Sequence, residues 1–271
     1  MIFSLPLAAG LALLPFISAQ ATDVDIKTIE AYFQAARIVP DYFKDFSPDA
    51  TLTLNYGGIG TLKTGQKVTK EQVNSAPTVT VTPEGTDKLG GLYTLAMIDL
   101  DIVGADVSAG VTRHWLVNGV KVDGTTVNNA TATAITPYAG PWPAAGSGPH
   151  RYVVVLYEQP TEFTAPEGFT GTLPVGVYDF KDYAEKAKLG NLVAANFIEV
   201  EEGTATVSLV STSTVNTATI TASTTKAGTS TTSSGAGASP TAASNNQNGA
   251  ISLAFSPIAA VVLAGLTFIT L

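Results

Sequence analysis

The two histidines are the residues of this sequence best suited to chemistry, and each borders an apolar run. His114 precedes the residues Trp-Leu-Val, and His150 follows a loop rich in glycine and proline over residues 140–149. In an extended strand, residues two apart share a face, so His150 and Tyr152 should point the same way. Asp99 supplies a carboxylate at the end of another apolar run. A carboxylate, two imidazoles and a glycine-rich loop at strand ends predict a small polar pocket whose N–H groups bind an anion.

Two other interpretations of these residues stay open at this point. A single histidine or aspartate at a strand end is often structural, and a loop of glycine and proline is often only a turn. His114, His150 and Asp99 also form a common metal-ligand set, since imidazoles and a carboxylate bind several transition metals. However, metal sites on strands often pair histidines at short spacing, and these two lie 36 residues apart. We therefore predict no metal site.

Most of the elements that must position these residues are predicted to be strands. Some runs are apolar throughout, which is typical of central strands that are buried on both faces, and others alternate between apolar and polar residues. Helical spacing of apolar residues predicts a helix over residues 26–36, ended by Pro40, and a short helix over residues 180–187. The predicted strands cover residues 51–56, 78–82, 92–98, 115–120, 153–157 and 194–200.

Three short segments carry a more specific signal. Residues 98–101 read I-D-L-D, residues 113–117 read R-H-W-L-V, and residues 146–159 read G-S-G-P-H-R-Y-V-V-V-L-Y-E-Q. Together they resemble the phosphatidylethanolamine-binding protein family, and the third segment is similar to the second signature of that family. The resemblance covers about residues 25–200.

The resemblance implies a mainly β fold, in which a large antiparallel sheet packs against a smaller sheet with a few peripheral helices. It also implies a small cavity near the surface that binds phosphate, carboxylate and phospholipid headgroups. The pocket positions of the family fall in this sequence on Asp99, His114, Gly140, His150 and Tyr152. Both histidines of the chain are thus expected in one ligand-binding pocket.

The sequence departs from the family pattern around this pocket. The first signature of the family usually reads D-P-D-x-P, and Leu100 and Val103 replace both prolines here. Because proline fixes φ, their loss should loosen or reshape the rim of the pocket. Trp142 replaces a family glycine, and it could fill part of the mouth or offer an aromatic wall. The resemblance therefore implies that the anion-binding floor is retained while the headgroup specificity is open.

Charge separates the middle of the chain from its two ends. All 22 acidic residues and 13 of the 14 basic residues lie between Asp23 and Glu202, which gives this part a formal net charge of −9. Such a balance argues against binding nucleic acid through a broad basic face. The sequence has no cysteine, which excludes disulfides, thiol nucleophiles and zinc sites built on cysteine. We predict no cofactor.

The two uncharged ends predict export and a lipid anchor at the cell surface or cell wall. Residues 1–21 have the apolar run and small residues of a secretory signal peptide. A domain over residues 22–203 is followed by residues 204–244, in which 22 serines and threonines are typical of an O-glycosylated stalk. Residues 245–271 combine a polar spacer with an uncharged apolar tail, which favours a removed glycosylphosphatidylinositol (GPI) signal over a transmembrane helix. Asn129, in the one Asn-x-Ser/Thr sequon, is a predicted N-glycosylation site on an exposed loop.

The leading functional interpretation is an extracellular, non-catalytic binding protein for an anionic small molecule or a phospholipid headgroup. The family includes an inhibitor of a vacuolar serine carboxypeptidase and regulators of kinases, so the resemblance implies a protease inhibitor or protein-interaction module as the first alternative. The stalk and tail favour a structural protein of the cell surface or wall as the second. An enzyme is the third alternative, and it is disfavoured because no serine stands in a nucleophile elbow. We therefore predict no catalytic residue.

Overall fold

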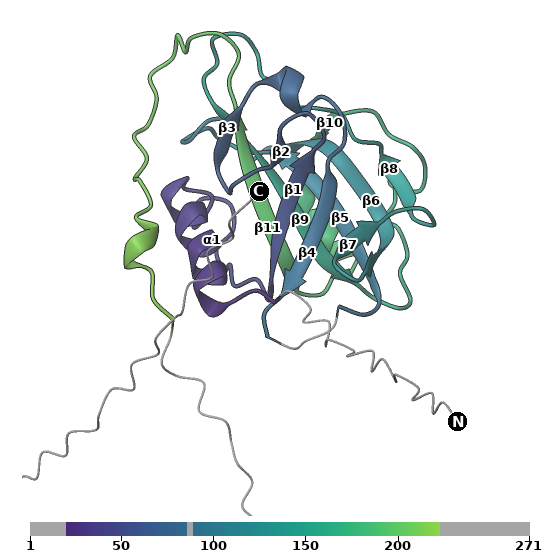
Figure 1. The fold of residues 1–271 in the computed structure, drawn as a ribbon. Helices are drawn as coiled ribbons and strands as arrows, with labels where there is room; N and C mark the ends of the chain where they lie inside the picture. Colours follow the sequence, from purple (N-terminus) through teal and green to yellow (C-terminus); the bar gives the residue numbers. More distant parts are fainter. Residues whose placement is uncertain (1–19, 86–88, 223–271) are drawn as a thin grey trace, which may run out of the picture. The chain divides into compact units, whose positions relative to one another are not determined.

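The computed structural model of this chain describes residues 20–85 and 89–222 (Figure 1). The predicted GPI signal, residues 223–244 of the predicted stalk, and all but the last two residues of the predicted signal peptide lie outside these residues. Among the described residues, no helix is both long enough and apolar enough to cross a membrane.

Strands hold more of the described residues than helices do, which confirms the predicted mainly β fold. Two α-helices accompany them, α1 (Asp23–Ala35) and α2 (Phe180–Lys186), together with the 3-10 helices η1 (Lys70–Val73) and η2 (Thr217–Thr219). The strands are β1 (Ala50–Tyr56), β2 (Gly60–Thr61), β3 (Gln66–Val68), β4 (Thr78–Pro83), β5 (Leu92–Asp99), β6 (Val111–Asp123), β7 (Thr126–Asn128), β8 (Thr133–Thr136), β9 (His150–Gln159), β10 (Gly176–Tyr178) and β11 (Leu192–Val200).

Three long antiparallel strands, β6, β5 and β9, form the centre of the larger layer, and β11 pairs with the free side of β9. The smaller layer is built around β1 and β4. The structure joins the two layers by hydrogen bonds on both sides. β7 bridges β4 and β6, and β1 pairs in parallel with β11 through Ala50 and Thr51. The two expected sheets are therefore parts of one sheet that closes on itself (Figure 1).

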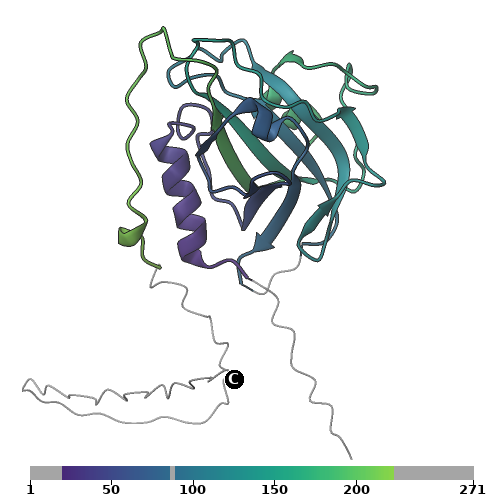
Figure 2. The ribbon, with the colours of Figure 1, turned by 45° about the horizontal axis from the view of Figure 1, so that its top comes forward.

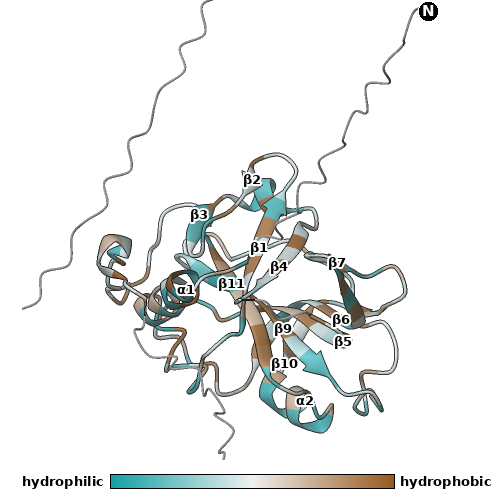
Figure 3. Cartoon of the chain, turned by 60° about the horizontal axis from the view of Figure 1, so that its bottom comes forward, coloured by the Kyte–Doolittle hydropathy of each residue, from teal (hydrophilic) through white to brown (hydrophobic). Residues whose placement is uncertain are grey.

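The central strands are buried on both faces, as their continuous apolar runs predicted. In β9, Val154 and Leu156 face the interior of the closed sheet, while Val153 and Val155 face the second core under the helices. Figure 3 shows the apolar residues along β9 and β1 in brown. Burying one such side chain contributes about 1.5–3 kcal/mol. Strands held by two cores give the residues at their ends fixed positions.

The helix predicted near the start of the described chain is confirmed as α1. Thr22 and Asp25 form a capping box, in which the Asp25 N–H donates to Thr22 Oγ1 and the Thr22 N–H donates to Asp25 Oδ2. This pattern satisfies two backbone donors at the helix start. Ile29 and Phe33 are buried, and the Phe33 ring meets that of Phe197 on β11 edge to face, with centroids 5.2 Å apart. The apolar face of α1 therefore covers one side of the larger layer.

Residues 203–222 run along the outer side of α1 (Figure 2). The ammonium group of Lys27 donates to the Thr221 carbonyl at 3.1 Å, and Thr217 lines a hollow together with residues of α1. The first part of the predicted stalk thus lies against the folded part of the chain.

Candidate anion-binding site

The residues predicted to form a pocket lie where the ends of β5 and β9 meet β6. Asp99, the last residue of β5, pairs with Tyr152 of β9 and with Thr112 of β6. Neighbouring strands lie about 5 Å apart. Their pairing therefore gathers the carboxylate of Asp99, both histidine rings and the Tyr152 side chain at one edge of the sheet.

Asp99 and His150 form an ion pair that is almost closed to solvent. Nδ1 of His150 lies 2.9 and 3.2 Å from the two carboxylate oxygens of Asp99, and the side chains are 12% and 11% exposed. Nε2 lies 2.9 Å from Ser147 Oγ. The Ser147 hydroxyl donates its one hydrogen to the Ala144 carbonyl at 2.7 Å, so its oxygen accepts a hydrogen from the ring. Both ring nitrogens of His150 therefore donate, and the ring is an imidazolium cation.

The pKa of His150 agrees with this hydrogen-bond pattern. Burial alone would lower the pKa, because the charged ring loses solvation. The hydrogen bond and negative charge of Asp99, together with the charge of Asp101, outweigh burial and raise the pKa of His150. The N–H groups of His150 are thus already used within the protein, and its charge neutralises Asp99.

The ring of His114 differs from that of His150 in its protonation state. The residue is buried, and Nδ1 lies 3.1 Å from the carbonyl oxygen of Ala139. Because a carbonyl only accepts, Nδ1 carries the hydrogen and Nε2 of the neutral ring carries none. Burial lowers the pKa of His114, although hydrogen bonds to the backbone of Ala139 and Gly140 and the charge of Asp99 act in the other direction. His114 is therefore neutral at neutral pH, and protonation gives it a second N–H donor.

Tyr152 lies between the two histidine rings. The His114 ring meets it edge to face with centroids 5.2 Å apart, and the His150 ring stacks on it at 6.3 Å. Tyr152 is fully buried, and its hydroxyl has no hydrogen-bond partner within residues 20–85 and 89–222. Burial, the charge of Asp99 and a contact of the hydroxyl with the Asp99 carboxylate that lacks hydrogen-bond geometry raise the pKa of Tyr152, and the Trp142 backbone acts in the other direction. The hydroxyl therefore keeps its proton. The site therefore contains a buried donor that the described chain does not satisfy.

Gly140 sets the distance between η1 and the loop beside His114. A β-carbon on Gly140 would lie 2.7 Å from Cα of Asn74 and 3.0 Å from the Val73 carbonyl oxygen. The loop can approach this closely only because residue 140 has no side chain. The preceding Ala139 exchanges two hydrogen bonds with His114, so the contact at Gly140 also fixes one wall of the site.

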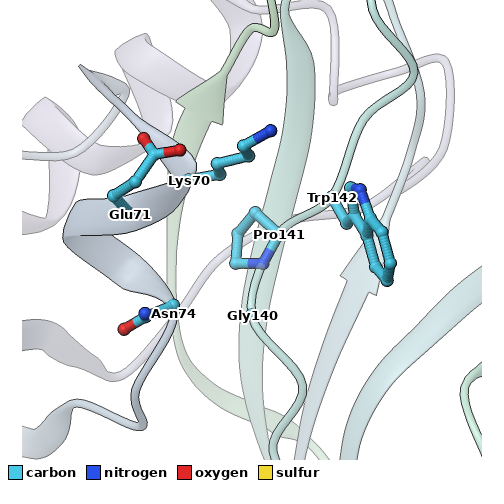
Figure 4. A pocket seen from close by; sticks show the side chains of 6 residues that line it. All are labelled: Lys70, Glu71, Asn74, Gly140, Pro141 and Trp142. Carbon is cyan, nitrogen blue, oxygen red and sulfur yellow. The ribbon is translucent and has the colours of Figure 1, made fainter.

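A pocket of about 400 Å³ opens beside this loop, between η1 and the loop residues (Figure 4). Trp142 is 82% exposed, so it does not fill the mouth of the site but forms one wall of this neighbouring pocket. Lys70 on the other wall pairs with Glu202 at 2.8 Å. The residues that line the pocket are Lys70, Glu71, Asn74, Gly140, Pro141 and Trp142.

Arg151 supports the site, and sequence reasoning did not identify this role. Its side chain leaves the face of β9 opposite to His150, as alternation predicted, and is 4% exposed. The guanidinium donates to backbone carbonyls of residues 100–102, in the turn that follows Asp99, and to the carbonyl of Ala36. These bonds hold the turn in which two family prolines are missing. The one sequence signal was a charged residue within an apolar strand.

The first residues of the predicted stalk contact the glycine-rich loop of the site. The Thr206 N–H donates to the Gly146 carbonyl at 2.9 Å. A β-carbon on Gly148, whose φ is +97°, would lie 2.8 Å from Cδ2 of Leu209. Residues 204–222 therefore pack on the folded chain beyond the predicted end of the domain, and sequence reasoning missed this contact.

Asn129 lies exposed in the connection between β7 and β8, where a glycan could be attached. Glycosylation of Asn129 stays a prediction. Within the part of the chain that the structure describes, no group of three or more histidine, aspartate or glutamate side chains is arranged to hold a metal ion.

Comparison with known proteins relates this geometry to a family. The sequence profile described as phosphatidylethanolamine-binding protein matches residues 44–207, which are more than half of the chain and include every residue of the site. The chain belongs to the phosphatidylethanolamine-binding protein family. The resemblance of its three short segments to that family is thereby confirmed.

Two curated relatives are similar in sequence to part of this chain. The 26 kDa secreted antigen of Toxocara canis is 31% identical over 121 residues, which cover 44% of this chain and 43% of the antigen. Phomoidride biosynthesis cluster protein N of a fungal species is 34% identical over 116 residues, which cover 40% of this chain and 52% of that protein. The chain thus matches about half the length of these two relatives.

The fold is similar to a solved structure, that of the carboxypeptidase Y inhibitor complexed with its cognate proteinase. It is 26% identical to this chain, with a TM-score of 0.53, and the match covers 65% of this chain and 95% of the inhibitor.

Proposed function

We propose that this family member is a non-catalytic, extracellular protein that binds a small anion, such as the phosphate of a phospholipid headgroup, against His114 and Tyr152. The observation that carries the proposal is the fully buried Tyr152 hydroxyl, which has no partner among the described residues. Buried donors are almost always satisfied, so an unsatisfied one among the predicted site residues favours a ligand oxygen as its partner. His150 and Asp99 neutralise each other, and they position the site without taking part in proton transfer.

The first prediction concerns the Tyr152 hydroxyl. Replacing Tyr152 with phenylalanine should weaken binding of phosphoethanolamine about tenfold or more, because a hydrogen bond to a charged group is lost. The free energy of unfolding should not fall, since the hydroxyl makes no hydrogen bond within residues 20–85 and 89–222. Calorimetric titration of the full chain with phosphoethanolamine measures the first effect, and urea unfolding measures the second.

Tyr178 offers a matched control. Its hydroxyl is also buried and has no partner among the described residues, but its ring lies against Arg113 on the other face of the sheet. Tyr178→Phe should leave phosphoethanolamine binding unchanged. Equal affinities of the wild type and Tyr152→Phe would remove the basis of the proposal. A second assay measures binding of the chain to vesicles that contain phosphatidylethanolamine. Binding to these vesicles would identify a lipid as the source of the phosphate, and binding to phosphoethanolamine alone would identify the free headgroup.

The second prediction concerns pH. The anion favours the protonated ring of His114, whose pKa burial lowers, so binding should strengthen as pH falls from 8 to 5. Uptake of one proton gives at most about a tenfold gain in affinity per pH unit. Sulfate is the suitable probe because its own charge is constant over this range. His114→Gln should abolish the pH dependence, whereas an unchanged slope in that variant would assign the proton to another group.

Inhibition of a serine carboxypeptidase is the second candidate function. It is favoured by the likeness to the carboxypeptidase Y inhibitor, which was solved in complex with its proteinase. Adding the purified chain to a carboxypeptidase assay tests it directly. Inhibition that persists in Tyr152→Phe would show that the inhibitory surface is separate from the anion site.

The extracellular location and the lipid anchor belong to the proposal as well. The uncharged ends of the sequence support them, and one relative is named a secreted antigen. Phospholipase C specific for phosphatidylinositol should release the chain from the surface of cells that express it, and chain that stays with the cells would argue against this anchor.

A further inference from the structure

A second cavity, of about 550 Å³, lies at the far end of the same central strands. β5 begins at this cavity with Leu92 and ends at the anion site with Asp99, and β9 runs from His150 to the cavity at Gln159. A strand rises about 3.3 Å per residue, so the two sites are roughly 20 Å apart. Small-molecule sites typically have volumes of about 300–1,000 Å³. We name this cavity the amide pocket after two of its lining residues, Asn118 and Gln159.

The Gln159 amide has a fixed orientation at the inner wall of the amide pocket. The backbone N–H of Gly119 donates to Gln159 Oε1 at 2.8 Å, and the Thr94 hydroxyl lies 3.1 Å from the same oxygen. Because a backbone N–H can only donate, this bond assigns the oxygen end of the amide. The NH₂ end of Gln159 is the end that remains for a ligand.

Asn118 adds a buried donor that the protein does not satisfy. Its Oδ1 accepts from the Tyr183 hydroxyl at 2.8 Å and lies 3.1 Å from the Thr94 hydroxyl oxygen. The residue is 4% exposed, and its Nδ2 is buried without a hydrogen-bond partner in the part of the chain that the structure describes. Such groups are rare because their desolvation is costly. An unsatisfied donor on a residue that lines a cavity favours a ligand that brings an acceptor.

The charge around the amide pocket favours an anionic acceptor. Lys121 is exposed at the pocket, and none of the described residues that line the pocket is an aspartate or glutamate. No ion pair holds Lys121 among the described residues. Arg113 lies behind the pocket, with its guanidinium carbon 5.5 Å from the centroid of the Phe169 ring. Lys121 is therefore the one charged side chain among the described residues that line the amide pocket.

The remaining walls of the amide pocket are apolar. The apolar side chains that line it include Leu92, Ile135, Phe163 and Phe169. The Phe169 ring meets the Tyr183 ring at a centroid distance of 4.8 Å, and the Arg113 contact holds its other side. A wall fixed in this way can receive an apolar group without first being ordered, which favours binding.

We propose that the amide pocket is a second ligand site, which binds a small carboxylate with an apolar body. The carboxylate accepts hydrogen bonds from Asn118 Nδ2 and the Gln159 amide and faces the charge of Lys121. The apolar body lies on Phe163 and Phe169. This ligand is distinct from the anion at His114, because the strands separate the two sites.

The test uses the full chain and octanoate as the probe. Octanoate should bind with one saturable site in calorimetric titration, whereas octylammonium, which has the same chain and the opposite charge, should not bind there. Sulfate at saturating concentration should leave octanoate binding unchanged. Competition by sulfate would place octanoate at His114 and would overturn the proposal.

Two variants separate binding from folding. Lys121→Gln changes an exposed side chain and should weaken octanoate binding about three- to fivefold, while Lys67→Gln, which removes the same charge at a different hollow, should have no effect. Asn118→Ala should weaken binding about tenfold, as expected for the loss of a hydrogen bond to a charged group. Urea unfolding shows whether Asn118→Ala is folded. Absence of octanoate binding to the wild type, or equal binding by Lys121→Gln and Lys67→Gln, contradicts the proposal.

Discussion

Replacing Arg151 with methionine should lower the free energy of unfolding by about 3–5 kcal/mol, because four carbonyl groups in two buried and two partly buried hydrogen bonds lose their donor. Nη2 of Arg151 donates to the Leu100 carbonyl at 2.8 Å and to the Ile102 carbonyl at 3.0 Å. Nε donates to the Asp101 carbonyl and Nη1 to the Ala36 carbonyl, both at 3.1 Å. Methionine keeps the apolar stem but satisfies none of these acceptors. The midpoint of urea unfolding measures the loss.

The same substitution should also weaken sulfate binding at the anion site. The carbonyls that Arg151 binds belong to the turn directly after Asp99, and Asp99 in turn orients His150. A loosened turn moves the carboxylate and lets water reach the ion pair, which is 11–12% exposed in the intact protein. We expect the affinity for sulfate to fall at least about tenfold, in line with the effects of other residues that hold a binding group in place.

Arg113→Met is the matched control for this prediction. Arg113 is 5% exposed and precedes His114, but it donates to Thr136 Oγ1 and to the Pro174 carbonyl and not to the turn after Asp99. Both variants should lose stability, and only Arg151→Met should lose sulfate affinity beyond what unfolding explains. If Arg151→Met does not fold, Arg151→Lys keeps the charge with fewer donors and should show a smaller loss of both properties. Equal sulfate affinities in the Arg113 and Arg151 variants would contradict a positioning role for Arg151.

Local sequence patterns identified the central strands because their two buried faces give continuous apolar runs. They could not reveal that the sheet closes on itself. The closing contact pairs Ala50 with Ala194 in parallel, and these residues are far apart in the sequence and small enough to fit any strand. Which strands meet over such a separation depends on the packing of the whole domain, and alternation within one strand does not encode it.

For the candidate site, the sequence likewise predicted which residues belong together but not the partners that set their charge. Alternation and the family resemblance placed Asp99, His150 and Tyr152 together, and the structure brings them together with His114. Sequence patterns do not distinguish the two histidines in charge, whereas in the folded chain the pKa of His150 is raised and that of His114 is lowered. The difference arises from partners that the chain brings in from elsewhere, a carboxylate for His150 and a backbone carbonyl for His114. Carbonyl groups have no sequence signature, and the role of Arg151 was missed for the same reason.

Gly140→Ala should lower the free energy of unfolding by about 1–3 kcal/mol through overpacking. The added β-carbon would lie 2.7 Å from Cα of Asn74 and 3.0 Å from the Val73 carbonyl oxygen. Both contacts are with backbone, which cannot rotate away as a flexible side chain would. The Tyr138 hydroxyl donates to that same carbonyl at 2.7 Å, so a shift of η1 also weakens this hydrogen bond. Urea unfolding followed by tryptophan fluorescence measures the loss of stability.

The substitution should also reduce the affinity for phosphoethanolamine, because the displaced loop carries the Ala139 carbonyl that holds Nδ1 of His114. Gly57→Ala is the control, since no atom lies within 4 Å of a β-carbon at that position. It should change the free energy of unfolding by no more than about 0.5 kcal/mol and leave binding intact. A lower free energy of unfolding with an unchanged affinity would mean that η1 is displaced and the loop beside His114 is not. In that case the wall beside His114 would be held by the Ala139 hydrogen bonds alone, and the close packing at Gly140 would serve folding only.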